Sequence, residues 1–136
     1  MIKPINHNPL TLSQRAQPAT LADTQIITDL LDTLHANTQI CVGMAANMIG
    51  VNKRIIVVQM GMLPVALVNP EIVEKSVPFA TKEGCLSLEG QRSTTRYKEI
   101  TVTYLDQNLR SHRQGFSDWI AQIIQHEVDH CEGILI

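Results

Sequence analysis

Two histidines four positions apart, near the end of the chain, have the clearest chemical potential. They stand in the run Gln125-His126-Glu127-Val128-Asp129-His130. Residues four apart on a helix share one face, about 5–6 Å apart, so these two imidazoles could bind one metal ion. Glu127 could then accept a proton from an attacking water. The pattern predicts a metal-dependent hydrolase, with a general His-Glu-x-x-His peptidase as one version of that prediction.

Two histidines do not complete such a site, because a catalytic metal usually has three protein ligands and one position open for water. Cys131 follows His130 directly and would point off the ligand face. Cys85 stands between Gly84 and Leu86, where the glycine permits close backbone approach and the thiol can lose its proton on a metal. From the residues alone, the candidates for the third ligand are Cys41, Cys85, His35, His112 and acidic side chains.

Hydrophobic periodicity predicts the elements that must position these groups. A helix is expected over residues 21–36, with Thr20 as its N-cap and Asp23 completing a capping box. Ser117 can cap a second helix over 118–131, which carries the histidine pair. Strands are expected at 54–59, 65–69 (ended by Pro70), 71–76 and 99–105. Residues 1–19 are predicted to form an extended arm or loop, and residues 40–50 a loop packed on the core.

Composition and element order predict a single α+β domain spanning 1–136, with antiparallel or mixed strands packed around a C-terminal metal-binding helix. The chain is 44% hydrophobic, 18% charged and carries a net charge of −2, which gives no case for nucleic acid or an anionic membrane as partner. Three cysteines are too few and odd in number for a secreted disulfide scaffold, and no signal peptide is expected. A cytoplasmic location is therefore expected.

Three motifs in order resemble those of the peptide deformylase family, the metalloenzymes that remove the formyl group from the N-terminus of new bacterial polypeptides. The family's Gly-φ-Gly-φ-Ala-Ala-x-Gln segment is similar to Cys41-Val-Gly-Met-Ala-Ala-Asn-Met48. Its Glu-Gly-Cys-φ-Ser motif is matched by Glu83–Ser87, and its Gln-His-Glu-x-Asp-His motif by Gln125–His130. The resemblance covers essentially the whole chain. The end at Ile136 is expected to restrict the subtype rather than the activity.

The resemblance implies one divalent metal ion, Fe²⁺ in the cell and replaceable by Ni²⁺, Co²⁺ or Zn²⁺, held by Cys85, His126 and His130. It implies that Glu127 passes a proton from the attacking water to the leaving amine and that the Leu86 N–H stabilises the oxyanion. The implied substrate is an N-formyl-methionyl peptide, met as a nascent chain at the ribosome. Its backbone would lie against Val42, Gly43 and Gly84, with Ile123 and Trp119 lining the methionine pocket. The family pattern suggests that Arg92 and Arg96 orient the second motif through carboxylates such as Glu83, with a plain surface role as an equal alternative for Arg92.

Two positions depart from the first motif. Cys41 replaces its first glycine, and Met48 replaces its glutamine, whose amide the family uses as an oxyanion donor. A thioether cannot donate a hydrogen bond, and losing one oxyanion donor typically lowers kcat by about 10²–10³. Three alternatives follow: a slow deformylase, one that uses another donor such as Asn47, or a catalytically impaired or non-hydrolytic relative that binds metal or peptide N-termini.

Overall fold

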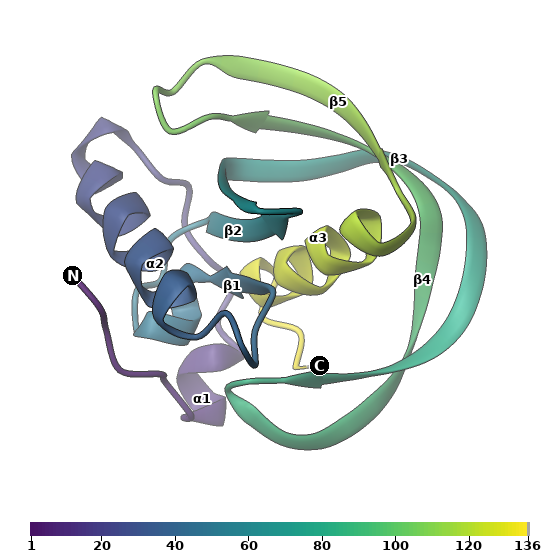
Figure 1. Ribbon diagram of the computed structural model, residues 1–136, viewed down its shortest axis with the longest axis horizontal. Coiled ribbons are helices and arrows are strands. Elements are labelled where there is room, and N and C mark those ends of the chain that lie inside the picture. Colours follow the sequence, from purple (N-terminus) through teal and green to yellow (C-terminus); the bar gives the residue numbers. More distant parts are fainter. Residues whose placement is uncertain (136) are drawn as a thin grey trace.

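A computed structural model describes residues 1–135 and contains one five-stranded antiparallel sheet with helices on both sides (Figure 1). The strands are β1 (Gly43–Ala45), β2 (Ile55–Met60), β3 (Leu63–Cys85), β4 (Leu88–Leu105) and β5 (Ser111–Ser117), paired in that order. The helices are α1 (Pro9–Leu12), α2 (Thr24–Ala36) and α3 (Asp118–Cys131), with 3₁₀ turns η1 (Leu21–Asp23) and η2 (Ala46–Ile49). The predicted α+β class is confirmed.

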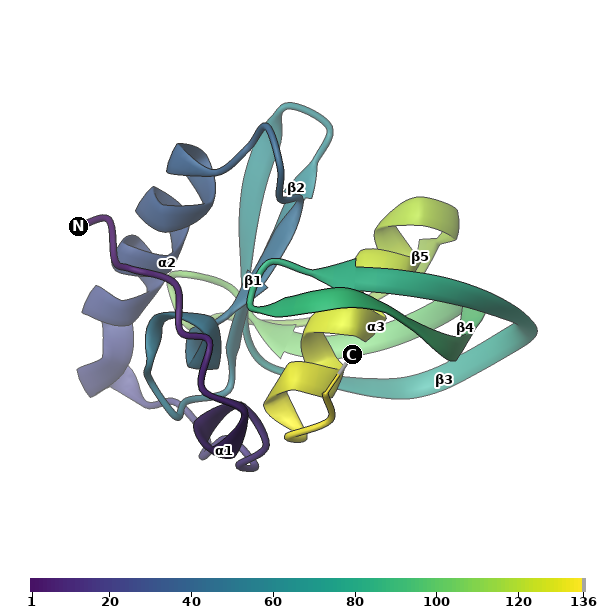
Figure 2. The ribbon, with the colours of Figure 1, turned by 90° about the horizontal axis from the view of Figure 1, so that it is seen from below.

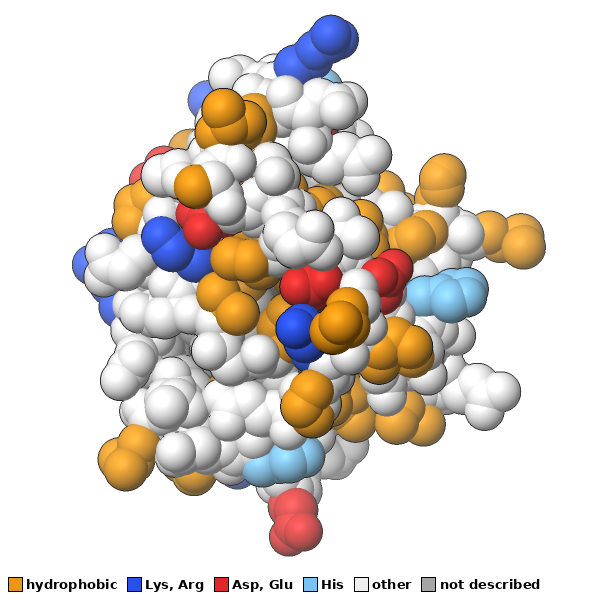
Figure 3. Space-filling view, turned by 90° about the vertical axis from the view of Figure 1, so that its left-hand side faces the viewer, with side chains coloured by type: hydrophobic (Ala, Val, Ile, Leu, Met, Phe, Trp, Pro, Cys, Tyr) orange, Lys and Arg blue, Asp and Glu red, His pale blue; other side chains and the backbone are white. Residues whose placement is uncertain are grey.

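The core lies on both faces of β2, because its side chains alternate between two hydrophobic clusters. Ile56 and Val58 face the cluster that includes Ile124 of α3, whereas Ile55 and Val57 face the cluster that includes the apolar stripe of α2. Figure 2 shows α2 and α3 on opposite sides of β1 and β2. On the face seen in Figure 3, charged and hydrophobic side chains are interspersed. Within residues 1–135, the helices are too short or too polar to cross a membrane.

Several expected elements are present with changed bounds. The capping box of Thr20 and Asp23 is formed, but it opens the turn η1, and α2 begins only at Thr24. Ser117 stands at the N-cap of α3 without a side-chain cap hydrogen bond. The arm over 1–19 contains the short helix α1, and the expected loop over 40–50 contains β1 and η2.

The prediction that Pro70 ends a strand is wrong. The strands expected at 65–69 and 71–76 are parts of one long strand, β3. The register shifts between Val68 and Glu71, where Asn69 has a φ of 50°, and a bulge of this kind tolerates a residue without an N–H. Beyond the bulge, β3 and β4 form a long ribbon that curves around α3 (Figure 1). This ribbon brings the second motif, Glu83–Ser87, against α3.

Gly133 ends α3 where the N-terminal arm crosses it. Its φ is +75°, and a Cβ there would lie 2.4 Å from the backbone oxygen of Ser13. The Ala16 N–H also donates to the Cys131 oxygen at 2.8 Å, so the arm and the helix end are closely packed.

We expect Gly133→Ala to lower the free energy of unfolding by about 1–3 kcal/mol more than Gly61→Ala, because overpacking adds to the cost of a left-handed backbone. Gly61 is the matched control, since its φ is +63° and a Cβ there would meet nothing within 4 Å. Urea unfolding of the two variants measures the difference. Equal losses would show that the contact with the arm contributes nothing.

Candidate metal centre

Three side chains from two distant segments meet to form a group that could hold a metal ion. The donor atoms of Cys85, His126 and His130 all lie within 4.8 Å of one another. The two imidazole centroids are 5.2 Å apart, as the spacing on a helix requires. The Cys85 Sγ lies 3.2 Å from His130 Nε2. The other third-ligand candidates that the sequence left open, Cys41, His35 and His112, are outside this group.

The chemistry of these donors suits a divalent ion with an open coordination position. One thiolate and two imidazoles are three ligands, as in catalytic rather than structural zinc-type sites. His126 uses Nδ1 to contact Glu83 Oε1 at 2.9 Å, which leaves Nε2 free for a metal. Burial lowers the pKa of His130 to about 3, so this imidazole is neutral and able to coordinate. The residues present therefore fit a metal ion.

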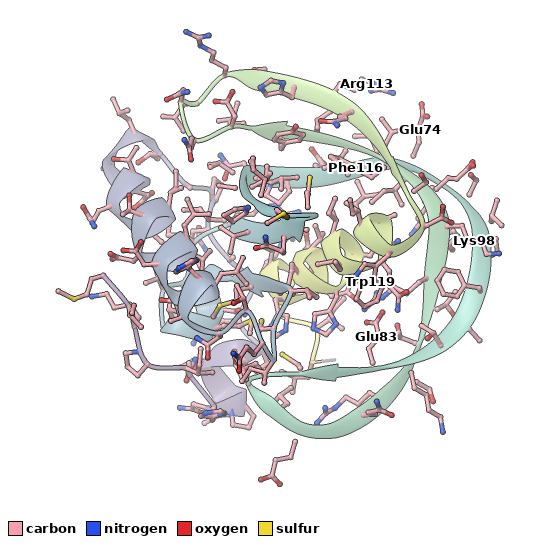
Figure 4. The ribbon with its side chains drawn as sticks, viewed as in Figure 1. Glu74, Glu83, Lys98, Arg113, Phe116 and Trp119 are labelled. Atoms are coloured by element: carbon pink, nitrogen blue, oxygen red, sulfur yellow. The ribbon has the colours of Figure 1, made fainter. Side chains whose placement is uncertain are left out.

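Glu83 is the centre of a buried polar network that holds the ribbon against α3. Its carboxylate accepts hydrogen bonds from Arg96 at 2.7–3.1 Å and from Gln122 Nε2 at 2.8 Å, besides its contact with His126. Burial opposes ionisation of Glu83, but the bonds from His126, Arg96 and Gln122 outweigh it and lower its pKa to about 2. Figure 4 shows Glu83 on the inner side of the curved ribbon, facing α3.

The arginine that orients the second motif is Arg96. Arg96 also donates to Asp129 Oδ2 at 2.6 Å, so it links Glu83 of β3 to Asp129 of α3. Arg92 stands opposite Glu83 in the strand pairing, but its Nη1 donates to the Glu89 backbone oxygen at 3.4 Å and the expected contact with Glu83 is not among those formed. Arg96 makes the contact because its buried guanidinium extends inward between the strands and α3.

Burial and neighbouring charges set the protonation of the remaining acidic and basic groups. Burial raises the pKa of Glu127 to about 7, and its Oε1 has no hydrogen-bond partner among the described residues. Burial alone would lower the pKa of His126, but the charge of Glu127 and bonds to Cys85 and Glu83 raise it to about 10.

A pocket of about 310 Å³ opens beside the three donors. It contains the residues that the sequence analysis assigned to substrate binding, Val42, Gly43, Gly84, Ile123 and Trp119, together with Leu86, Glu127, Cys85 and His126. The pocket is also lined by four residues that the sequence did not point to, Ile40, Lys82, Gln91 and Gln122. Gln122 could have been found, since it stands four residues before His126 on the same face of α3.

The structure excludes Asn47 as a replacement for the missing amide donor. Asn47 Nδ2 donates to the backbone oxygens of His130 at 3.0 Å and Leu12 at 3.4 Å, and this buried side chain is not part of the pocket wall. Met48 does reach the pocket, and its Sδ accepts the Ala45 N–H at 3.4 Å. Cys41, the other departure, lies at the pocket wall, and burial raises the pKa of its thiol to about 12.

We expect Cys85→Ser to weaken the binding of Co²⁺ sharply, because a serine hydroxyl does not ionise as the thiol does and is a poorer ligand. Cys41→Ser is the matched control, since it changes a thiol in the same pocket that lies outside the donor group. Titration with Co²⁺, followed by the thiolate absorption band, measures both affinities. Unchanged affinity and stoichiometry in Cys85→Ser would contradict the three-ligand site.

Comparison with known proteins agrees with this geometry. The sequence model of the polypeptide deformylase family matches residues 2–136. The chain is 54% identical to a peptide deformylase of Clostridium beijerinckii over 136 residues, which covers all of both chains. It is 36% identical to peptide deformylase 3 of Shewanella oneidensis over 128 residues, which covers 90% of this chain and 78% of that one.

Solved structures give the same result. The fold superposes on the peptide deformylase of Thermotoga maritima with a TM-score of 0.89 at 31% identity, covering 99% of this chain and 95% of that one. For the Met-Ala-Ser-bound class I type b peptide deformylase of Acinetobacter baumannii, the TM-score is 0.88 at 29% identity, covering 99% and 97%. With its sequence matched almost from end to end and its fold shared, this chain belongs to the polypeptide deformylase family.

Proposed function

We propose that this protein is a metal-dependent hydrolase that removes the N-formyl group from formyl-methionyl peptides of nascent proteins. The observation that carries the proposal is the buried Glu127 carboxylate, which has a free oxygen and lies in one pocket with Cys85 and His126. The full-length relative at 54% identity supports the same function. No comparison favours the alternative of a non-hydrolytic protein.

Cys85, His126 and His130 are the proposed ligands of one divalent ion, with Fe²⁺ as the native metal and Ni²⁺, Co²⁺ or Zn²⁺ as replacements. A mixed thiolate and imidazole set accepts all of these ions. When bound, the ion supplies polarisation of the formyl carbonyl and lowers the pKa of the attacking water. Glu83 holds the ring of His126 in position through the 2.9 Å contact at Nδ1.

Glu127 is the proposed general base and acid. It takes a proton from water as the new C–O bond forms and gives that proton to the amine as the C–N bond breaks, which releases formate and a free N-terminus. Gly43 leaves room for the Glu127 side chain, because a Cβ at residue 43 would lie 3.0 Å from Glu127 Oε2 and 2.7 Å from Ile123 Cγ2. A glycine there lets the base lie against β1.

The proposed substrate is bound as an added strand. β1 is an edge strand of the sheet, so the edge at Val42 and Gly43 that faces away from β2 can pair with an extended peptide, with Gly84 on its other side. The methionine side chain then lies against Ile123 and Trp119. The Leu86 N–H, which donates no backbone hydrogen bond within the described residues, is the proposed donor to the developing oxyanion.

We also propose that the protein works in the cytoplasm on chains emerging from the ribosome, as part of N-terminal processing in protein biosynthesis. Its three cysteines are free thiols, which suits a reducing compartment.

The test is hydrolysis of formyl-Met-Ala-Ser by protein loaded with Ni²⁺ or Fe²⁺, followed by the release of formate. We expect turnover, and we expect Glu127→Gln to lower kcat by about 10²–10⁴ because the proton transfer is lost. Glu132→Gln is the control and should retain activity, because Glu132 is the C-cap residue of the same helix, lies outside the pocket and is paired with Arg54. No turnover by fully loaded wild-type protein would contradict the proposal.

Met48 gives a second prediction. Because a thioether cannot donate to an oxyanion, we expect Met48→Gln to raise kcat on formyl-Met-Ala-Ser by up to about 10², with little change in KM. Steady-state kinetics with equally metal-loaded proteins measure the change. A fall in kcat for Met48→Gln at unchanged stability would mean that the site is adapted to the methionine.

A further inference from the structure

The wall of the pocket formed by α3 contains one amide, next to two apolar side chains. Trp119, Gln122, Ile123, His126 and Glu127 line the pocket from positions i, i+3, i+4, i+7 and i+8, and so share one helix face. Ile123 and Trp119 are apolar, whereas Gln122 on the same helix face is half-buried and polar. A polar group placed beside apolar side chains in a pocket commonly decides which ligand is accepted.

The orientation of this amide is fixed by its neighbour. Gln122 Nε2 donates to Glu83 Oε2 at 2.8 Å, and a carboxylate can only accept, so the amide nitrogen must face Glu83. Arg96 and His126 hold Glu83 itself in place. The amide of Gln122 is therefore preorganised, and one of its two N–H groups makes no hydrogen bond to a described residue.

We propose that Gln122 is a specificity-determining residue of the pocket. It selects peptides whose first residue has an unbranched, apolar side chain that contains one hydrogen-bond acceptor. This inference rests on the proposed function, because it places the first side chain of the formyl peptide against Ile123 and Trp119. The free N–H of Gln122 then donates to the thioether sulfur of methionine. A hydrocarbon of the same length, norleucine, leaves that N–H unpaired in a half-buried wall.

The preference should be modest, because a thioether is a weak acceptor. One hydrogen bond of this kind corresponds to a kcat/KM for the methionine peptide that is about three to ten times the value for the norleucine peptide. The comparison between methionine and norleucine isolates it, since the two side chains have nearly the same length and shape. General effects of a substitution on the metal or on Glu127 cancel in the ratio, because both substrates undergo the same chemical step.

The experiment compares formyl-Met-Ala-Ser with formyl-norleucyl-Ala-Ser for wild type, Gln122→Leu and Gln91→Leu. We expect the methionine peptide to be favoured about three- to tenfold by wild type and by Gln91→Leu, and the ratio to fall to about one in Gln122→Leu. Gln91 is the matched control because it is an amide of the same pocket that comes from β4 and lies beside Gly84.

A second measurement needs no turnover. Trp119 is the only tryptophan of the chain and lines the pocket, so its fluorescence reports the binding of deformylated Met-Ala-Ser and norleucyl-Ala-Ser. For wild type, we expect the dissociation constant of norleucyl-Ala-Ser to be about three to ten times that of Met-Ala-Ser. A ratio near one in wild type, or a ratio that Gln122→Leu leaves unchanged, would overturn the role of Gln122, and the wild-type value decides even if the variant does not fold.

The two proposals fail in different ways. Turnover of both formyl peptides without discrimination overturns the role of Gln122 and leaves the deformylase function standing. Discrimination in the fluorescence titration without turnover of either formyl peptide supports the role of Gln122 and contradicts the deformylase function.

Discussion

The buried carboxylate of Glu83 is the contact on which the arrangement of the site depends. A charge at 9% exposure is costly unless it is fully hydrogen-bonded, and Glu83 meets this condition with partners from two elements, Arg96 on β4 and Gln122 and His126 on α3. Satisfying this one group therefore requires that the ribbon and the helix lie together. The thiol of Cys85, two residues further along β3, is brought to the histidine pair by the same contact.

The ribbon formed by β3 and β4 needs this contact because few of its side chains are buried in a hydrophobic core. Residues 71–80 of β3 are mostly exposed, and the hydrophobic clusters lie at the other end of the sheet, around β2. Arg96 adds a second attachment through Asp129, and the Gln125 side chain pairs with both the N–H and the carbonyl of Tyr97 at 2.8–2.9 Å. Polar contacts along α3 thus hold the ribbon in place, whereas apolar packing holds β1 and β2.

One part of the pocket wall can accept a peptide backbone of any sequence, and another part can distinguish between side chains. Gly43 leaves room for Glu127, and the edge of β1 is free to pair with a backbone of any sequence. In the proposed binding mode, selection comes from side-chain contacts, of which the α3 face offers Trp119, Gln122 and Ile123. This division is suited to an enzyme that must process chains of many different sequences beginning with the same residue.

The histidine pair, its glutamate and the two longer helices could be predicted from the sequence, because helical spacing is a local property. It also indicated β2 and the inner face of β4 at Ile100, Val102 and Tyr104, since alternation of apolar residues is local too. It missed β1, the full length of β3 and β4, and all of β5. The polar sequence of β5, Ser111–Ser117, carries no apolar alternation, and the strand is held by pairing with β4.

Residue spacing alone left open which cysteine joins the histidines, and the family resemblance pointed to Cys85, which the three-dimensional structure places beside them. Which arginine meets Glu83 and what Asn47 contacts emerged only from the folded chain. The spacing of Cys41 and Cys85 in the chain gives no measure of their distance from α3, because a bulge at Asn69 and a curved ribbon intervene. Arg92 is the nearer in sequence to Glu83, yet Arg96 is the one whose side chain enters the buried layer. Such contacts depend on long-range packing, which no local pattern encodes.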